Sequence, residues 1–232
     1  MKVLKDKRWL NGILCALFAV IIMALIVLLK KYNVETIGET EMKIGFAKVN
    51  KTVFNSLGTS NLFHIVSTVI MIIMILVAVA FVVLAIIELV KKKDFDKLDN
   101  SYKSLALTYV LTAWVYVIFE YILVINNRPT TGVVTTSASF PSTHTLIIVM
   151  VSLTSLTMLE RIIKNKKILY SCEALLGLLG ILGVVTRLLS GKHWFTDIIA
   201  GVLFGIMFYF FHKFLTEFLN EYDKKKLKKK AE

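Results

Sequence analysis

The sequence predicts an all-α fold, a polytopic membrane bundle of six transmembrane helices with both termini in the cytoplasm. Of its 232 residues, 56% are hydrophobic and only 19% are charged, whereas soluble domains usually carry about a quarter charged residues. The charges gather between long apolar stretches. Six of these stretches approach the roughly 20 residues that a helix needs to cross about 30 Å of hydrocarbon.

The six spans follow from hydropathy and length, taken in chain order. The first begins after a basic start that resembles a signal peptide, but its apolar part is too long and no small-residue cleavage site follows it. The second lies inside a charge-free stretch, and the fourth is short but apolar. The expected spans are about 9–29, 62–87, 104–125, 144–159, 168–189 and 196–215. Together they predict one integral-membrane domain over 1–232, with its core motifs at about 104–215.

The distribution of positive charge predicts the orientation of these spans. Of the 28 Lys and Arg residues, 20 lie in the two termini and the second and fourth connections, and 8 lie in the other connections. Because cytoplasmic segments carry the excess of Lys and Arg, both termini are expected in the cytoplasm, in a multi-pass protein of the plasma membrane. The basic tail, 216–232, is then a topology signal and a contact for anionic lipid, and nucleic acid is not an expected partner.

The long outer connection, 30–61, contains one amphipathic pattern. Its apolar residues recur at helical spacing, which predicts a short helix. The members of this pattern are Phe46, Val49, Val53, Phe54 and Leu57. Two placements remain open: a helix lying in the outer membrane interface, or a loop helix packed on the protein itself.

Polar residues that the membrane does not explain gather at three places. Arg128-Pro129 ends the third span, the run 141–144 (Pro-Ser-Thr-His) opens the fourth, and Arg187, His193 and Asp197 join the fifth to the sixth. With both termini inside, the third and fifth spans run outward and the fourth and sixth return. All three clusters therefore belong at the outer surface, where they form one candidate site.

The chemistry of these side chains favours an anion over a metal. Two histidines and a carboxylate, here His144, His193 and Asp197, are a known set of metal ligands. Arg128 and Arg187 oppose a cation, and guanidinium groups match phosphate oxygens in pairs. The Ser142 hydroxyl and the free N–H groups at the start of the fourth helix add donors. The predicted ligand is phosphate, with no metal and no cofactor.

The histidines acquire separate roles around such a phosphate. If the sixth helix begins at or before His193, that residue shares a face with Asp197, whose carboxylate then holds one imidazole nitrogen. The other nitrogen is free for covalent attack on phosphorus. His144 serves as general acid toward the leaving oxygen and then as base for the hydrolytic water.

These residues resemble the type-2 phosphatidic acid phosphatase superfamily, the lipid phosphate phosphatases, whose signature is Lys-x6-Arg-Pro, Pro-Ser-x-His and Ser-Arg-x5-His-x3-Asp. Arg128-Pro129 matches the end of the first part, 141–144 matches the second, and 186–197 matches the third with Thr in place of Ser. The resemblance implies that His193 forms a phosphohistidine, that Asp197 orients it and that His144 is the acid. It also implies that the phosphate is held by Arg128, Ser142, Thr143 and Arg187.

One position departs from the signature. Tyr121 stands seven residues before Arg128, where the family has Lys. A phenol donates one hydrogen bond but brings no charge. Lys192, beside the proposed nucleophile, is the candidate substitute, and its alternative is a lysine in solvent.

The function predicted from the sequence is removal of the terminal phosphate from a lipid phosphate or diphosphate at the outer leaflet. Undecaprenyl diphosphate, phosphatidylglycerol phosphate and phosphatidic acid are the candidate substrates. Two alternatives stay open: a lipid phosphotransferase that uses the same histidine, and a non-catalytic membrane carrier or binder. Oligomeric state is not readable, because lipid-facing and helix-facing stripes look alike.

Overall fold

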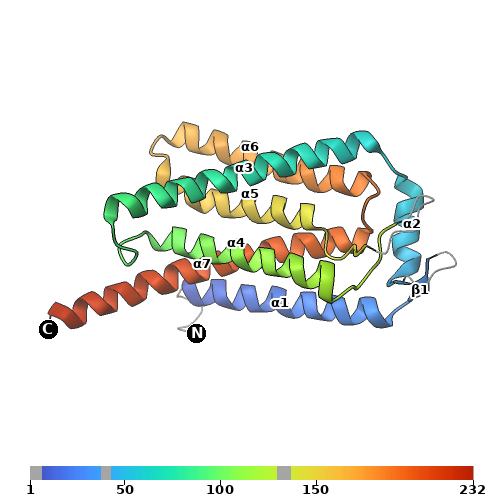
Figure 1. Ribbon diagram of the computed structural model, residues 1–232, viewed down its shortest axis with the longest axis horizontal. Helices are drawn as coiled ribbons and strands as arrows, with labels where there is room; N and C mark the ends of the chain where they lie inside the picture. Colours follow the sequence, from blue (N-terminus) through green and yellow to red (C-terminus); the bar gives the residue numbers. More distant parts are fainter. Residues whose placement is uncertain (1–6, 38–42, 130–136, 232) are drawn as a thin grey trace.

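The computed structural model describes residues 7–37, 43–129 and 137–231 as an elongated bundle of helices (Figure 1). Within these described ranges, six helices are long and apolar enough to cross a membrane. In chain order the elements are α1 (Lys7–Lys31), β1 (Glu35–Thr36), β2 (Lys43–Ile44), α2 (Ala47–Leu57), α3 (Asn61–Lys92), α4 (Asn100–Val117), η2 (Ile118–Ile122), α5 (Thr143–Ile162), α6 (Lys166–Leu189) and α7 (Phe195–Ala231). The predicted all-α bundle of six spans is therefore confirmed.

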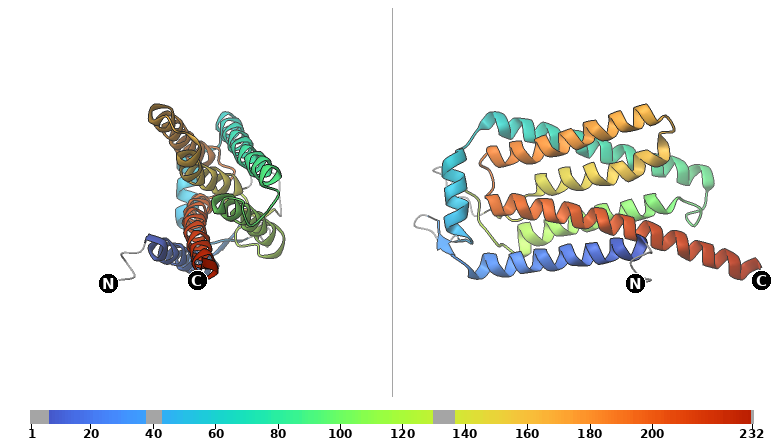
Figure 2. Two further views of the ribbon diagram at one scale, coloured as in Figure 1. Left: turned by 90° about the vertical axis from the view of Figure 1, so that its left-hand side faces the viewer. Right: turned by 180° about the vertical axis from the view of Figure 1, so that it is seen from behind.

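Of the six long helices, α5 is the most deeply buried. α5 packs against α3, α6 and α7, while α1 and α4 pack against α7 (Figure 2). Two glycines of α7 allow its close approach to α5. A Cβ at Gly201 would lie 2.7 Å from the Ser142 carbonyl oxygen, and one at Gly205 would lie 2.7 Å from Val149. Small residues at such crossings bring backbones together, and here they place the first turns of α5 and α7 side by side.

Two helices end at other residues than the spans predicted from the sequence. The third span is helical only to Ile122, because α4 is followed directly by the π-helical turn η2, which ends there. The chain from there to Arg128 is not helical. It leaves the helix because the side chain of Asn126 pairs with other segments, including the backbone N–H of Gly45 at 3.0 Å. The helix of the sixth span extends past residue 215, through the basic tail to Ala231, in a stretch without Gly or Pro that has a Glu221–Lys225 ion pair of 2.9 Å.

The short helix α2 lies across one end of the bundle, the end opposite both termini (Figures 1 and 2). It packs on the protein itself. Phe54 contacts Trp194 with ring centroids 5.4 Å apart. The buried Asn50 donates to Thr196 Oγ1 at 2.9 Å and accepts from the Thr196 N–H at 3.1 Å, which ties α2 to the first turn of α7.

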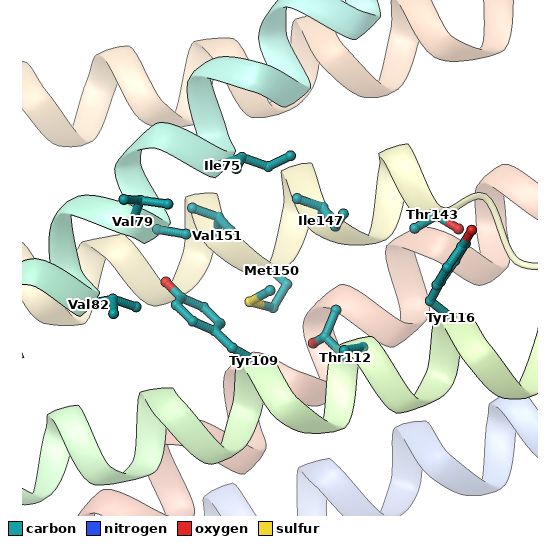
Figure 3. A pocket seen from close by; sticks show the side chains of 12 residues that line it. Ile75, Val79, Val82, Tyr109, Thr112, Tyr116, Thr143, Ile147, Met150 and Val151 are labelled. Atoms are coloured by element: carbon teal, nitrogen blue, oxygen red, sulfur yellow. The ribbon is translucent and has the colours of Figure 1, made fainter.

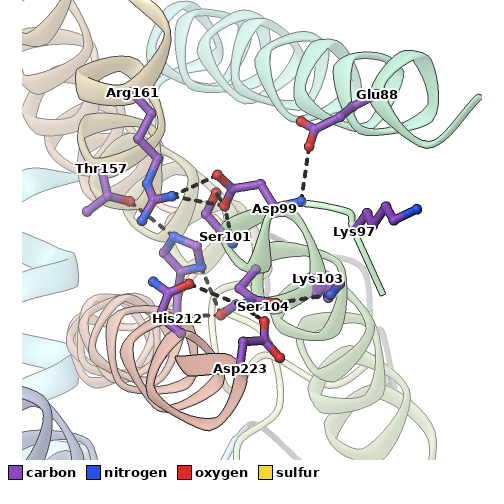
Figure 4. A network of polar contacts seen from close by, with 12 residues as sticks. Glu88, Lys97, Asp99, Ser101, Lys103, Ser104, Thr157, Arg161, His212 and Asp223 are labelled. Carbon is purple, nitrogen blue, oxygen red and sulfur yellow. Dashed lines mark hydrogen bonds and ion pairs between the residues drawn. The ribbon is translucent and has the colours of Figure 1, made fainter. Parts of the chain in front are cut away.

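The end that carries the termini is held by a second set of polar contacts (Figure 4). His212 of α7 lies between the hydroxyls of Ser104 and Thr157, each 3.1 Å from a ring nitrogen. Nearby, Arg161 binds both carboxylate oxygens of Asp99, at 2.9 and 3.1 Å. Because these contacts join α4, α5 and α7 far from α2, they fix the helices at one end while their other ends form the candidate site.

Candidate active site

The three polar clusters singled out in the sequence meet at the α2 end of the bundle. The segments on either side of the α4–α5 connection approach each other through a bridge between Asn127 and Ala138. The N–H of Ser142 donates to the carbonyl oxygen of Asp197 at 3.0 Å, which joins the start of α5 to the start of α7. The folding of the chain thus brings together residues that lie up to 70 positions apart in the sequence, from Asn127 to Asp197.

His193 lies in the turn between α6 and α7, where Gly191 adopts a φ of 66°. The ring is 4% exposed. Its Nδ1 is 2.8 Å from the carbonyl oxygen of Ser139. Because a carbonyl can only accept, Nδ1 carries the hydrogen and Nε2 carries the lone pair.

Burial lowers the pKa of His193 well below its usual value, and the positive charges of Arg187 and Arg128 lower it further. Desolvation disfavours the charged imidazolium, and neighbouring cations do the same. The ring is therefore neutral at neutral pH, with Nε2 unprotonated.

Asp197 does not hold His193 in the way expected from the sequence. α7 begins at Phe195, so His193 precedes the helix and the two residues do not share a helical face. The buried carboxylate accepts instead from the hydroxyl of Ser139 at 2.6 Å, from the Asn126 amide at 2.8 Å and from the Trp194 N–H at 3.1 Å. It reaches the imidazole through Ser139, whose hydroxyl is 3.3 Å from Nδ1.

Arg187 is the most deeply buried cation of the site, with 2% exposure. Its Nη2 is 2.9 Å from Nε2 of His193, and its Nη1 is 3.1 Å from Nδ1 of His64 on α3. Its Nε is buried and has no hydrogen-bond partner among the residues that the structure describes. A buried donor without a partner is uncommon and calls for an explanation, and an oxyanion would supply the missing acceptor.

Arg128 provides the second guanidinium. Its Nε donates to the carbonyl oxygen of Ala138 at 3.0 Å, which points the side chain back toward the segment that carries Ser139. Among the described residues, neither Arg128 nor Arg187 forms an ion pair with a carboxylate. The described part of the site therefore carries an excess of positive charge.

The start of α5 carries the motif 141–144. Ser142 is fully buried, and its hydroxyl oxygen caps the helix by accepting from the N–H of Thr145 at 3.5 Å and from the Thr145 hydroxyl at 3.0 Å. The next two residues, Thr143 and His144, are half-buried in the first helical turn. The cap fixes the backbone from which both side chains project.

The two residues considered as replacements for the family lysine lie outside this hydrogen-bonded set. Tyr121 is 71% exposed, and its ring stands edge-on to Tyr116 at 6.0 Å. Lys192 is exposed, and its backbone N–H donates to the hydroxyl of Ser190. It lies near enough to His64 to act on that ring electrostatically.

Three residues of the site were not predicted from the sequence: His64, Asn126 and Ser139. His64 carried the clearest signal, because an ionisable side chain within a hydrophobic span is a functional candidate by default. Asn126 and Ser139 resemble ordinary loop residues, and only the tertiary fold brings them to Asp197. No group of three or more His, Cys, Asp or Glu side chains in the described part of the chain is arranged to hold a metal ion.

The fold defines the chain as a multi-pass membrane protein, and comparison with known proteins defines its family. The model of the PAP2 superfamily matches residues 102–218, half of the chain. The chain therefore belongs to the PAP2 superfamily, as its resemblance to the type-2 phosphatidic acid phosphatases predicts.

One solved structure is similar over almost the whole chain. It is a transmembrane PAP2-type phosphatidylglycerolphosphate phosphatase from Bacillus subtilis, with a TM-score of 0.51 and 16% identity. The match covers 91% of this chain and 96% of that one. At this identity the likeness concerns the fold. Comparison with curated protein sequences found no match.

Proposed function

We propose that the protein is a lipid phosphatase that removes a terminal phosphate from a lipid phosphate or diphosphate through a phosphohistidine at Nε2 of His193. The observation that carries this proposal is the state of the imidazole: Nδ1 donates to Ser139, and the unprotonated Nε2 lies 2.9 Å from the Arg187 guanidinium. A nucleophilic nitrogen next to a phosphate-binding group is the arrangement that covalent phosphoryl transfer requires.

The first step forms a bond from Nε2 to phosphorus and breaks the bond from phosphorus to the leaving oxygen. Arg187 then exchanges its contact with Nε2 for phosphate oxygens, and Arg128 binds from the opposite segment. His144 donates its proton to the leaving oxygen. Asp197 holds Ser139, whose carbonyl keeps the Nδ1 proton in place as positive charge develops on the ring.

The second step returns the enzyme to its starting state. His144 takes a proton from water, the water oxygen attacks phosphorus, and the bond between phosphorus and Nε2 breaks. Inorganic phosphate leaves, and the lone pair returns to Nε2. The positive charge that stabilises both transition states comes from the two arginines, so no metal or cofactor takes part.

The lipid part of the substrate is proposed to lie in a groove between α3, α4 and α5 (Figure 3). The groove has a volume of about 460 Å³ and an almost entirely apolar lining. Thr143 and Tyr116 lie at one end, and Val82 and Tyr109 lie at the other. Since Thr143 directly precedes His144, the groove leads from the candidate site along the hydrophobic length of the helices.

The outer leaflet is the proposed side of the reaction. The site lies at the end of the bundle opposite both termini, and the excess of Lys and Arg in the termini and in the second and fourth connections supports a cytoplasmic position for those parts. The proposed location is the plasma membrane.

Phosphate release from purified protein in detergent tests the function. Undecaprenyl diphosphate, phosphatidylglycerol phosphate and phosphatidic acid should be compared with and without a chelator, and His193→Asn serves as the inactive variant. We expect release from at least one lipid that is insensitive to the chelator and abolished by His193→Asn. An acid-labile phosphoenzyme should form in the wild-type protein only. Unchanged release by His193→Asn would refute the covalent mechanism, and strong inhibition by the chelator would refute its independence of metal.

A further inference from the structure

The side chain of Arg187 is held between two imidazoles from different parts of the chain. Nη2 faces Nε2 of His193, and Nη1 faces Nδ1 of His64 in the first turns of α3. Both imidazole nitrogens must present lone pairs, because a guanidinium has only donors. His64 therefore carries its hydrogen on Nε2, the tautomer opposite to that of His193.

The proposed reaction breaks the contact of Arg187 with His193 and keeps its contact with His64. When phosphorus bonds to Nε2 of His193, that nitrogen no longer has a lone pair for Arg187. The contact with His64 is unaffected, because Nδ1 of His64 takes no part in the chemistry. His64 then remains as the side chain that holds one arm of the guanidinium, while Nε and Nη2 turn to phosphate oxygens.

The local surroundings of His64 fit this role better than a packing role. The ring is half-buried, and its Nδ1 accepts a hydrogen bond from Arg187. The hydroxyls of Ser67 and Thr68 bond to the His64 backbone oxygen and leave the ring free. Because Nη1 of Arg187 lies 3.1 Å from Nδ1, the ring meets the buried guanidinium as a neutral acceptor and not as a second cation.

We infer that His64 is a positioning residue that holds Arg187 toward the phosphate through Nδ1. This inference rests on the proposed function and adds to it a residue from α3, outside the segment 102–218 that matches the family. The role requires an acceptor at the Nδ1 position and nothing from the rest of the ring. A substitution that keeps this acceptor should therefore preserve activity.

The experiment compares three variants of the full-length protein in detergent. His64→Asn keeps an oxygen acceptor close to the position of Nδ1, His64→Leu removes the acceptor at similar volume, and His64→Gln displaces the acceptor by about 1.5 Å, one carbon–carbon bond. We expect kcat/KM to fall about 10- to 100-fold in the Leu and Gln variants, because a misplacement of about 1 Å can cost about 100-fold. His64→Asn should stay within about threefold of wild type. Equal loss in the Asn and Leu variants, with unchanged melting temperatures, would overturn the role.

A second readout separates this inference from the function on which it rests. Inorganic phosphate should raise the melting temperature of the wild-type and Asn proteins more than that of the Leu and Gln proteins. If the wild type releases no phosphate from any lipid, but its stabilisation by inorganic phosphate depends on His64 in this way, the proposed function is refuted and the positioning role is supported. If the wild type is active and both the Leu and Gln variants keep full activity, the positioning role is refuted and the proposed function is supported.

Discussion

Nε2 of His193 lies 2.9 Å from Nη2 of Arg187, so the proposed nucleophile and the proposed phosphate ligand are in direct contact. This contact does two things. It keeps the proton of the imidazole on Nδ1, because a guanidinium can only donate to Nε2. It also places the guanidinium where phosphate oxygens must lie when phosphorus reaches Nε2.

Replacing Arg187 by lysine should therefore lower activity although it keeps the positive charge, because the hydrogen bonds of the guanidinium are lost. Lysine cannot contact His193, His64 and phosphate through one planar fork. We expect kcat/KM to fall by about 100- to 1000-fold, the range found when one donor to a transition state is lost. Phosphate release with the preferred lipid is the measurement. The matched control is Arg161→Lys at the opposite end of the bundle, which should leave kcat/KM near the wild-type value; an equal loss there would point to general damage.

The relay from Asp197 through Ser139 to His193 predicts a particular pattern of non-additivity. Asp197→Asn turns an acceptor of three hydrogen bonds partly into a donor. We expect a loss of kcat of about 100-fold, less than the roughly 10⁴-fold effect known where a carboxylate contacts the catalytic histidine directly. Ser139→Ala should cost about 10-fold, because the carbonyl contact to Nδ1 remains.

The double variant tests whether the two residues act in one relay. Asp197→Asn combined with Ser139→Ala should be about as impaired as Asp197→Asn alone, because both changes interrupt the same connection. Single-turnover kinetics on all three proteins give the comparison. If the losses multiply, the two residues act separately.

The lowered pKa of His193 predicts how stability depends on pH. Below about pH 6.5 an unfolded histidine takes up a proton, whereas the buried ring remains neutral in the folded protein. The unfolded state then binds more protons, so the contribution of His193 to stability falls as the pH falls through this range.

Melting temperatures of the wild type and His193→Asn in detergent check this sign. The melting temperature of the wild type minus that of the variant should decrease as the pH is lowered from about 7.5 to about 5, the interval that spans the ordinary pKa of histidine. Parallel curves for the two proteins would contradict the neutral, buried state of the ring.

The groove between α3, α4 and α5 predicts a selective defect for lipid substrates. Val79→Trp should fill part of the groove and lower kcat/KM for a long-chain lipid phosphate by about 10-fold, or about 1.4 kcal/mol. A short-chain, water-soluble phosphate ester should be affected little, because it does not need the groove.

The chain offers a matched control for this test. Val185 has similar exposure, 46% against 50% for Val79, and lines a groove of about 470 Å³ between α5, α6 and α7. Val185→Trp should leave both substrates unaffected. If it impairs the long-chain lipid as strongly as Val79→Trp does, the tail does not lie where we propose.

The sequence predicts the spans and the family motifs because both are local properties. Hydropathy alone defines a long apolar helix, and the motif 141–144 needs only neighbouring residues to be recognised. The two arginines and two histidines are placed at one end by counting spans. The motif residues, the arginines and the histidines could therefore be assigned to the site from the order of the spans along the chain.

The remaining parts depend on contacts that no local pattern contains. The Asp197–His193 pairing was expected on condition that the helix began at or before His193, and the start of α7 at Phe195 removes that condition. Asn126 and Ser139 contact Asp197 because two irregular segments pair across the α4–α5 connection. Tyr121 lies within η2, whose π-helical turn departs from the α-helical register that the sequence pattern assumes, and its side chain is exposed.

The buried guanidinium of Arg187, whose Nε has no partner in the described part of the chain, also affects how the protein behaves during purification and turnover. A site that lacks acceptors for its donors binds the product as well as the substrate, since both present phosphate oxygens. Phosphate buffer should then protect the protein against heat while slowing its reaction, because ligand that binds only the folded state stabilises it by mass action. The same donors that speed bond cleavage would make departure of inorganic phosphate a slow part of each cycle.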